Sequence, residues 1–184
     1  MLQSILIPFG TIFLAELLDK SQLSILLLAT KTRHHYQLLL GVFFAFLIVD
    51  GLAIFLGSYL TTLIPLFWLK IISGGLFIAF GVKALLDKHD SKVKIKKVGN
   101  VFFSAFSLIF VSEWGDKTQI ASALFATKFN PFAVLLGIML ALMLLAALTI
   151  LLSKMIKAHV KSGVISKIAG VLFIVLGLAF FFVG

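Results

Sequence analysis

The chain has 184 residues, of which 61% are hydrophobic and only 12% are charged, and its mean hydropathy is +1.19. Soluble domains carry about 25% charged residues, so this composition excludes a soluble domain and indicates an all-α integral membrane protein. The formal net charge is +9, and the lack of cysteine excludes disulfides and thiolate metal sites.

Six long apolar segments are typical of transmembrane helices and lack the alternation of barrel strands. They cover Leu2–Thr30, Tyr36–Tyr59, Leu66–Leu86, Val98–Thr127, Pro131–Ser153 and Val164–Val183. The opening residues lack the basic stretch of a cleavable signal sequence, so we expect them to belong to the first span. A bilayer needs about 20 helical residues, so the first and fourth spans, which are much longer, must tilt strongly or break.

A charged cluster in the first span recurs in the fourth. ELLDKSQLSILLLATK begins at Glu16 and EWGDKTQIASALFATK begins at Glu113, a constant offset of 97 over sixteen positions. Three glycine pairs continue the match at an offset of 96: Gly41 with Gly137, Gly74 with Gly170, and Gly81 with Gly177. We therefore predict two three-helix repeats, residues 1–87 and 98–184, joined within one membrane domain by a basic linker at residues 88–97. Because three is odd, the second repeat is expected to be inverted.

Lysine and arginine are distributed unevenly between the two sets of loops. One set holds twelve of them, and the other holds only Lys70 and Lys128. Basic residues concentrate in cytoplasmic loops, so we expect the linker in the cytoplasm and both termini outside, in the cell's cytoplasmic membrane. We prefer this topological interpretation of the basic linker over binding to nucleic acid or to particular lipids.

Five of the seven acidic residues lie inside predicted spans: Glu16, Asp19, Asp50, Glu113 and Asp116. A charge at the bilayer centre costs roughly 3 kcal/mol or more, so each needs a partner, water or an ion. Glutamate and aspartate three residues apart share a helix face, so each motif offers two carboxylates, and the inverted symmetry would bring four together. Possible further ligands or proton sites are Ser21, Gln22, Asp50, Thr118 and Gln119.

Such an oxygen-rich site suits divalent ions such as Mn²⁺, Ca²⁺ and Mg²⁺. Four carboxylates less Lys20 and Lys117 leave two negative charges, which one divalent cation neutralises. Without the cation, burial and mutual repulsion favour protonation of the carboxylates. A site that holds either protons or a metal ion couples their movement in opposite directions, which predicts antiport.

At these motifs the chain resembles the transmembrane protein 165 family of membrane cation exporters, which is marked by a duplicated E-x-G-D-[KR]-[ST] motif. EWGDKT at residues 113–118 matches fully, and ELLDKS at residues 16–21 departs only at Leu18, where the family has glycine. The resemblance implies exchange of Mn²⁺ or Ca²⁺ against protons, with manganese export in the bacterial branch. It also implies that the metal ion is bound by Glu16, Asp19, Glu113 and Asp116, and that the motifs are completed by Lys20, Ser21, Lys117 and Thr118.

We therefore expect a proton-coupled Mn²⁺ exporter without a resident cofactor. Enzymatic chemistry has no support, because no nucleophile and base pair or phosphate loop is present. The open alternatives are a Ca²⁺/H⁺ exchanger, an exporter of amino acids or other small solutes resembling the lysine exporters, and a non-transporting scaffold. The motif lysines, four residues after their glutamates, could instead form structural salt bridges. Asp50, whose counterpart is Ala146, is interpreted as either a proton site or a packing partner, and the oligomeric state stays open.

Overall fold

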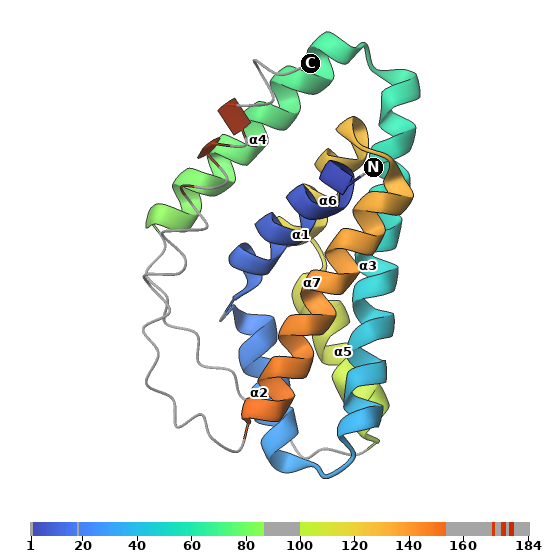
Figure 1. Cartoon of the computed structure of the whole chain (residues 1–184), viewed down its shortest axis with the longest axis vertical. Coiled ribbons are helices and arrows are strands. Elements are labelled where there is room, and N and C mark those ends of the chain that lie inside the picture. The colour runs from blue at the N-terminus through green and yellow to red at the C-terminus, as the bar shows by residue number, and fades with distance from the viewer. Residues whose placement is uncertain are drawn as a thin grey trace.

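The computed structural model describes residues 2–17, 19–86 and 100–153, together with residues 171, 174, 175, 177 and 178. This part of the chain is all-helical, without strands, as predicted (Figure 1). Its seven helices are α1 (Leu2–Glu16), α2 (Lys20–Lys31), α3 (His35–Leu63), α4 (Leu66–Leu86), α5 (Val101–Glu113), α6 (Lys117–Lys128) and α7 (Pro131–Leu152). The predicted linker at residues 88–97, Leu18 and most of the sixth span lie outside the described residues.

Two of the described helices are long and apolar enough to cross a membrane. They are α3, over His35–Leu60, and α7, over Pro131–Leu152. Helix α3 is longer than the predicted second span, whereas α4 has the bounds of the predicted third span. Helices α1 and α5 are apolar but shorter, because each forms only the first part of a predicted long span.

Both of the long predicted spans are broken at their charged motifs. Helix α1 ends at Glu16 and α5 ends at Glu113, and α2 and α6 each begin four residues later. In each turn the backbone N–H of the motif aspartate, Asp19 or Asp116, donates to the carbonyl of that glutamate at 3.2 Å. Each glutamate therefore closes one half-helix, and each aspartate directly precedes the next.

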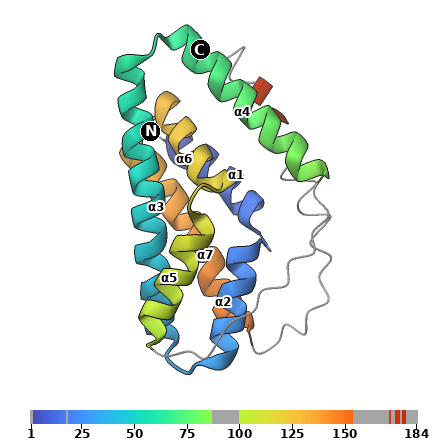
Figure 2. The ribbon, with the colours of Figure 1, turned by 180° about the vertical axis from the view of Figure 1, so that it is seen from behind.

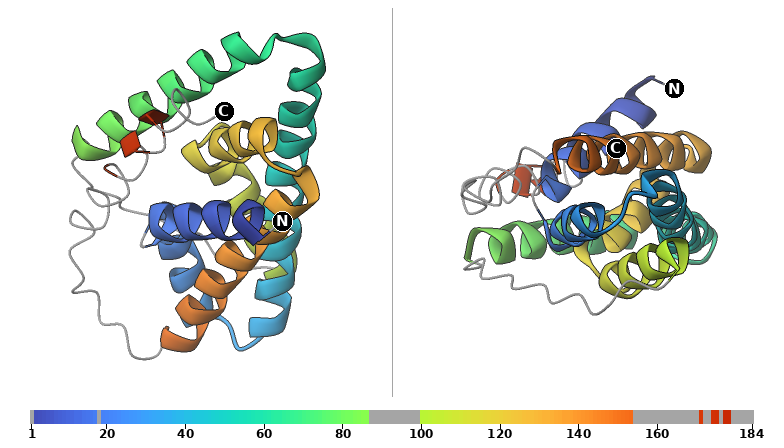
Figure 3. Two further views of the ribbon diagram at one scale, coloured as in Figure 1. Left: turned by 45° about the horizontal axis from the view of Figure 1, so that its top comes forward. Right: turned by 90° about the horizontal axis from the view of Figure 1, so that it is seen from below.

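The unbroken helix of each half packs against the broken helix of the other half. Helix α3 contacts α5 and α6, whereas α7 contacts α1 and α2 (Figures 1 and 2). Figure 3 shows the crossing of α1 and α7 from two further directions. Helix α4 stands apart from this bundle and reaches α6 through Phe77, whose ring centroid lies 5.3 Å from that of Phe125.

Two glycines allow these helices to approach closely. A Cβ atom added at Gly41 on α3 would collide with the carbonyl oxygen of Phe102 on α5, and one added at Gly137 on α7 would collide with that of Ile5 on α1. Gly41 and Gly137 are 96 residues apart, and Ile5 and Phe102 are 97 apart, which are the offsets of the sequence repeat. The same backbone contact therefore occurs twice, once in each direction between the halves.

The close approach at Gly41 predicts a specific loss of stability. We expect Gly41→Ala to lower the free energy of unfolding by about 1–3 kcal/mol, because the new methyl group meets a backbone carbonyl that cannot move aside. Gly51→Ala on the same helix is the matched control, since nothing lies within 4 Å of its added Cβ. Thermal unfolding of purified protein in detergent measures both, and equal melting temperatures for the two variants would contradict this packing.

Candidate cation-binding site

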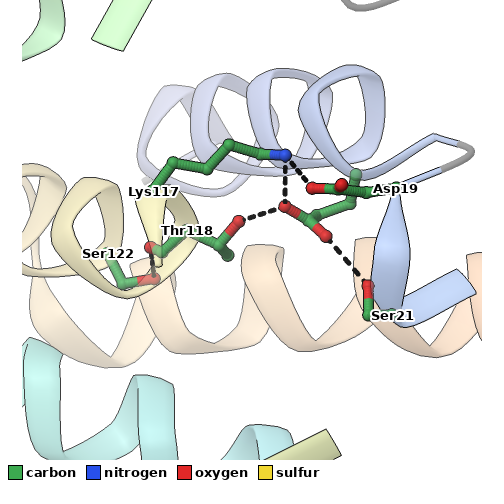
Figure 4. Close-up of polar contacts among 6 residues, drawn as sticks. Asp19, Ser21, Lys117, Thr118 and Ser122 are labelled. Atoms are coloured by element: carbon green, nitrogen blue, oxygen red, sulfur yellow. Dashed lines mark hydrogen bonds and ion pairs between the residues drawn. The ribbon is translucent and has the colours of Figure 1, made fainter. Parts of the chain in front are cut away.

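The two motif turns lie against each other, and their polar contacts cross from one motif to the other. The Lys117 ammonium forms an ion pair with Asp19 and lies 3.4 Å from Glu16 Oε1 (Figure 4). The Thr118 hydroxyl donates to the same Glu16 oxygen. Residues about 100 positions apart in the sequence are thereby joined at one point in the bundle.

Glu16 is the most enclosed carboxylate of this group. Its side chain has 0% exposure, and each of its oxygens has a donor. Oε1 accepts from Thr118, and Oε2 accepts from the Ser21 hydroxyl at 3.1 Å. A buried carboxylate with donors on both oxygens is held in one orientation, because losing a donor leaves its charge uncompensated.

Three carboxylates from the two motifs are close enough to share one metal ion. Glu16, Asp19 and Asp116 each offer an oxygen, and these oxygens all lie within 4.8 Å of one another. Oxygens bound to one Ca²⁺ or Mg²⁺ at about 2.0–2.6 Å are up to roughly 5 Å apart, so the observed spacing fits a divalent cation. Glu16 is buried and the two aspartates are partly exposed, which leaves the group reachable from outside the core.

Glu113, the fourth predicted ligand, is near this group but is not one of the three. Its side chain is buried, and Oε2 has no hydrogen-bond partner among the described residues. Glu113 interacts electrostatically with Glu16, Asp116 and Asp50, so these carboxylates place it in a negative electrostatic potential. A buried carboxylate oxygen without a donor is costly unless a proton or cation compensates it.

The expected alternative, a salt bridge within each motif, is not what the described part of the second motif shows. The salt bridges of Lys117 go to Asp19 and Glu16 in the first motif rather than to Glu113. The side chain of Lys20 lies outside the described residues. Lys117 therefore neutralises carboxylates across the interface between the halves.

The two motif glutamines use their amide oxygens to hold the structure. Gln119 Oε1 accepts from the backbone N–H of Gly115 at 2.6 Å, and Gly115 has a φ of +78°, a left-handed conformation that favours glycine. Gln22 Oε1 accepts from the Thr149 hydroxyl on α7 at 2.9 Å. These contacts fix the turn and the helix packing beside the carboxylates.

Asp50 has a partner that the sequence analysis did not identify. Asp50 lies on α3 with 1% exposure, and its Oδ1 accepts from the Ser122 hydroxyl on α6 at 2.6 Å. The available signal was that Ser122 aligns with Ile25 in the repeat, as Asp50 aligns with Ala146. Asp50 and Ser122 are thus polar residues whose counterparts in the other half are apolar.

Comparison with known proteins places this chain in a family. The family model described as "Divalent cation/proton antiporter GDT1" matches residues 4–92 and 101–184. A Vibrio cholerae protein named "Putative manganese exporter" is 32% identical over 94% of this chain and 88% of its own. GDT1-like proteins of Synechocystis and Schizosaccharomyces pombe are 27% and 25% identical, over 88% and 100% of this chain and 88% and 83% of their own. No solved structure resembles the chain closely enough to count as a match.

The helical bundle and these matches define a membrane transporter and not an enzyme. The chain belongs to the GDT1 family of divalent cation/proton antiporters, which confirms the resemblance found in the two motifs.

The ion pair between the motifs predicts a coupling energy that a double-mutant cycle can measure. We expect Asp19→Asn and Lys117→Gln to be coupled by about 0.5–3 kcal/mol, because each removes the partner of the other. The matched cycle pairs Lys117→Gln with Glu113→Gln and should give a smaller coupling. Unfolding of the purified variants in detergent provides the energies. A larger coupling energy of Lys117 with Glu113 than with Asp19 would instead support a salt bridge within the second motif.

Proposed function

We propose that this protein exports Mn²⁺ from the cytoplasm in exchange for protons. The observation that carries the proposal is the group formed by Glu16, Asp19 and Asp116, which draws oxygens from both motifs to within 4.8 Å. Exchange against protons agrees with the family, and the choice of Mn²⁺ follows the name of the Vibrio cholerae relative. Carboxylate oxygens are ligands that Mn²⁺ accepts well.

The charges of the group suit one divalent cation. Three carboxylates and the Lys117 ammonium sum to two negative charges, which one Mn²⁺ balances. Buried Glu113 adds a fourth carboxylate that can complete the ligand set or carry a proton. In the absence of the metal ion, Lys117 and protons compensate the same oxygens, so cation and protons compete for them.

The proposed architecture is a pair of inverted three-helix repeats with six spans. In it α1 with α2 and α5 with α6 form the first span of each repeat, and α3 and α7 form the second. The paired glycine contacts and the equal hydrogen bonds of the two turns support this arrangement. The segments matched by the family model, 4–92 and 101–184, agree with the proposed repeats. Inverted repeats of transporters place the substrate where broken helices meet, as at these motifs.

The cation-binding proposal is tested with Asp116→Asn, which keeps the size of the side chain and removes its charge. We expect the affinity for Mn²⁺ to fall about 10-fold or more, since the bound divalent ion loses a compensating charge. Isothermal titration calorimetry of purified protein measures this affinity. Asp90→Asn, in the predicted linker outside both motifs, is the matched control and should bind Mn²⁺ like the unaltered protein.

Transport itself is measured in proteoliposomes with an imposed pH gradient. We expect Mn²⁺ to accumulate on the more acidic side, and Ca²⁺ added in excess to compete only weakly. Dominant Ca²⁺ transport would favour the Ca²⁺/H⁺ exchanger. Flux of amino acids would favour the solute exporter, and absence of any flux in folded protein would favour the scaffold.

The proposed orientation, with the linker in the cytoplasm and both termini outside, has its own test. The chain contains no cysteine, so a single introduced cysteine can be labelled without background. We expect Ser91→Cys in the linker to resist a membrane-impermeant thiol reagent in intact cells, whereas Gln3→Cys near the N-terminus reacts. The reverse pattern would overturn the orientation.

A further inference from the structure

Asp50 and Ser122 form a buried polar pair that is separate from the three clustered carboxylates of Glu16, Asp19 and Asp116. Asp50 has 1% exposure, and its Oδ2 has no hydrogen-bond partner among the described residues. Oδ1 accepts from Ser122 at 2.6 Å. A carboxyl group with a single neutral donor is poorly compensated as an anion, so this site favours a bound proton.

The Ser122 hydroxyl gives this pair two satisfied hydrogen-bond arrangements. Ser122 Oγ lies 2.6 Å from Asp50 Oδ1 and 2.8 Å from the backbone carbonyl of Thr118, and a hydroxyl has only one hydrogen to donate. When Asp50 is ionised, Ser122 donates to it. When Asp50 is protonated, its own O–H donates to Ser122, and Ser122 donates to Thr118.

In the second arrangement, Thr118 links Ser122 to Glu16, one of the three clustered carboxylates. Thr118 accepts from Ser122 at its backbone carbonyl and donates from its side chain to Glu16 Oε1 (Figure 4). Protonation of Asp50 therefore changes the hydrogen bonding of Thr118, the residue that donates to Glu16. Among the described residues, the hydrogen bonds of Asp50 lead to Glu16 through Ser122 and Thr118, which suits Asp50 for holding a proton rather than the metal ion.

The charges around Asp50 are mostly negative. Glu16, Glu113 and Asp116 interact with it electrostatically, and each disfavours a further negative charge. Lys117, on the neighbouring helix α6, makes its salt bridges to Glu16 and Asp19. Helix α7 carries no titratable residue. The titratable residues of α2 are two lysines, one at each end of the helix. A divalent cation bound at the motif carboxylates would reduce this negative field.

The other half of the protein lacks this polar pair. Ile25 aligns with Ser122 and Ala146 aligns with Asp50, and both apolar side chains have 0% exposure. A purely structural need of the fold would be met by the same contact in both halves. The pair is therefore an addition to one half of an otherwise repeated architecture.

We propose that Asp50, positioned by Ser122, carries one of the protons exchanged for the cation, at a site separate from the cation ligands. This rests on the proposed proton-coupled transport. Cation binding reduces the negative field and releases the proton from Asp50, and cation release restores it. The coupling thus runs through the field and the Ser122–Thr118 contact, without Asp50 touching the metal ion.

The test compares Asp50→Asn with the unaltered protein in two measurements. The first is the Mn²⁺ affinity of purified protein at acidic pH, where Asp50 holds its proton and asparagine resembles it, so we expect a change of less than about 3-fold, against about 10-fold or more for Glu16→Gln. The second is the number of protons moved per Mn²⁺ in proteoliposomes containing a trapped pH dye. We expect this number to fall by about one, and accumulation against a gradient to fall about 10-fold or more.

Two further variants keep the test decisive if Asp50→Asn does not fold. Ser122→Ala keeps the carboxyl group but removes its donor, so we expect unchanged Mn²⁺ affinity and a shift of at least about half a unit in the pH at half-maximal transport. Thr127→Val on the same helix is the matched control, because its hydroxyl bonds to Leu124 of its own helix and should shift nothing.

Each result decides the inference. An unaltered proton count in Asp50→Asn, a loss of affinity as large as in Glu16→Gln, or an unshifted pH profile in Ser122→Ala would overturn it. If the unaltered protein itself moves Mn²⁺ without protons, the proposed exchange fails instead, and the two failures are distinguished by that measurement.

Discussion

The organisation of this protein depends on the cost of placing carboxylates within apolar helices. A buried carboxylate needs donors or a cation, and a continuous helix has already used its backbone N–H groups. Breaking the helix after Glu16 and after Glu113 creates two turns that face each other and supply neighbouring side chains to the acids. The second motif then supports the first, since Thr118 donates to Glu16 and Lys117 pairs with Asp19.

The sequence was sufficient to predict features that follow from local composition. Span lengths predicted helices at α3, α4 and α7, and the overlong first and fourth spans predicted that each would tilt or break. The partners of Lys117 were not predictable, because spacing offers Glu113 on the same chain segment, whereas the folded bundle offers Asp19 from the other half. Ser122 was missed for a related reason: comparing the repeats emphasises positions that match, and Ser122 matters because its counterpart Ile25 does not.

Similar backbones in the two halves carry different chemistry. The turns share their hydrogen bonds, and Gly41 and Gly137 make corresponding contacts. Yet the Asp50–Ser122 pair exists in one half only, and Gly115 has a left-handed conformation where the first motif has Leu18 in the sequence. The sequence repeat thus accounts for the contacts that the halves share, and the differences between its copies give one half a buried polar pair where the other half has Ile25 and Ala146.

The contacts between the halves are of two kinds, and their difference bears on the proposed exchange. At Gly41 and at Gly137, which have no side chain, the backbone of the neighbouring helix packs directly against the glycine. No ion takes part in these two contacts. Between the motifs the contacts are ionic and hydrogen-bonded, and they use carboxylate oxygens of Glu16 and Asp19 that the proposed cation would also bind. In the proposed exchange, cation binding would therefore act on the polar contacts and leave the glycine contacts unaltered. If the halves are inverted repeats as proposed, one half would rock against the other around the motifs, where the polar contacts lie.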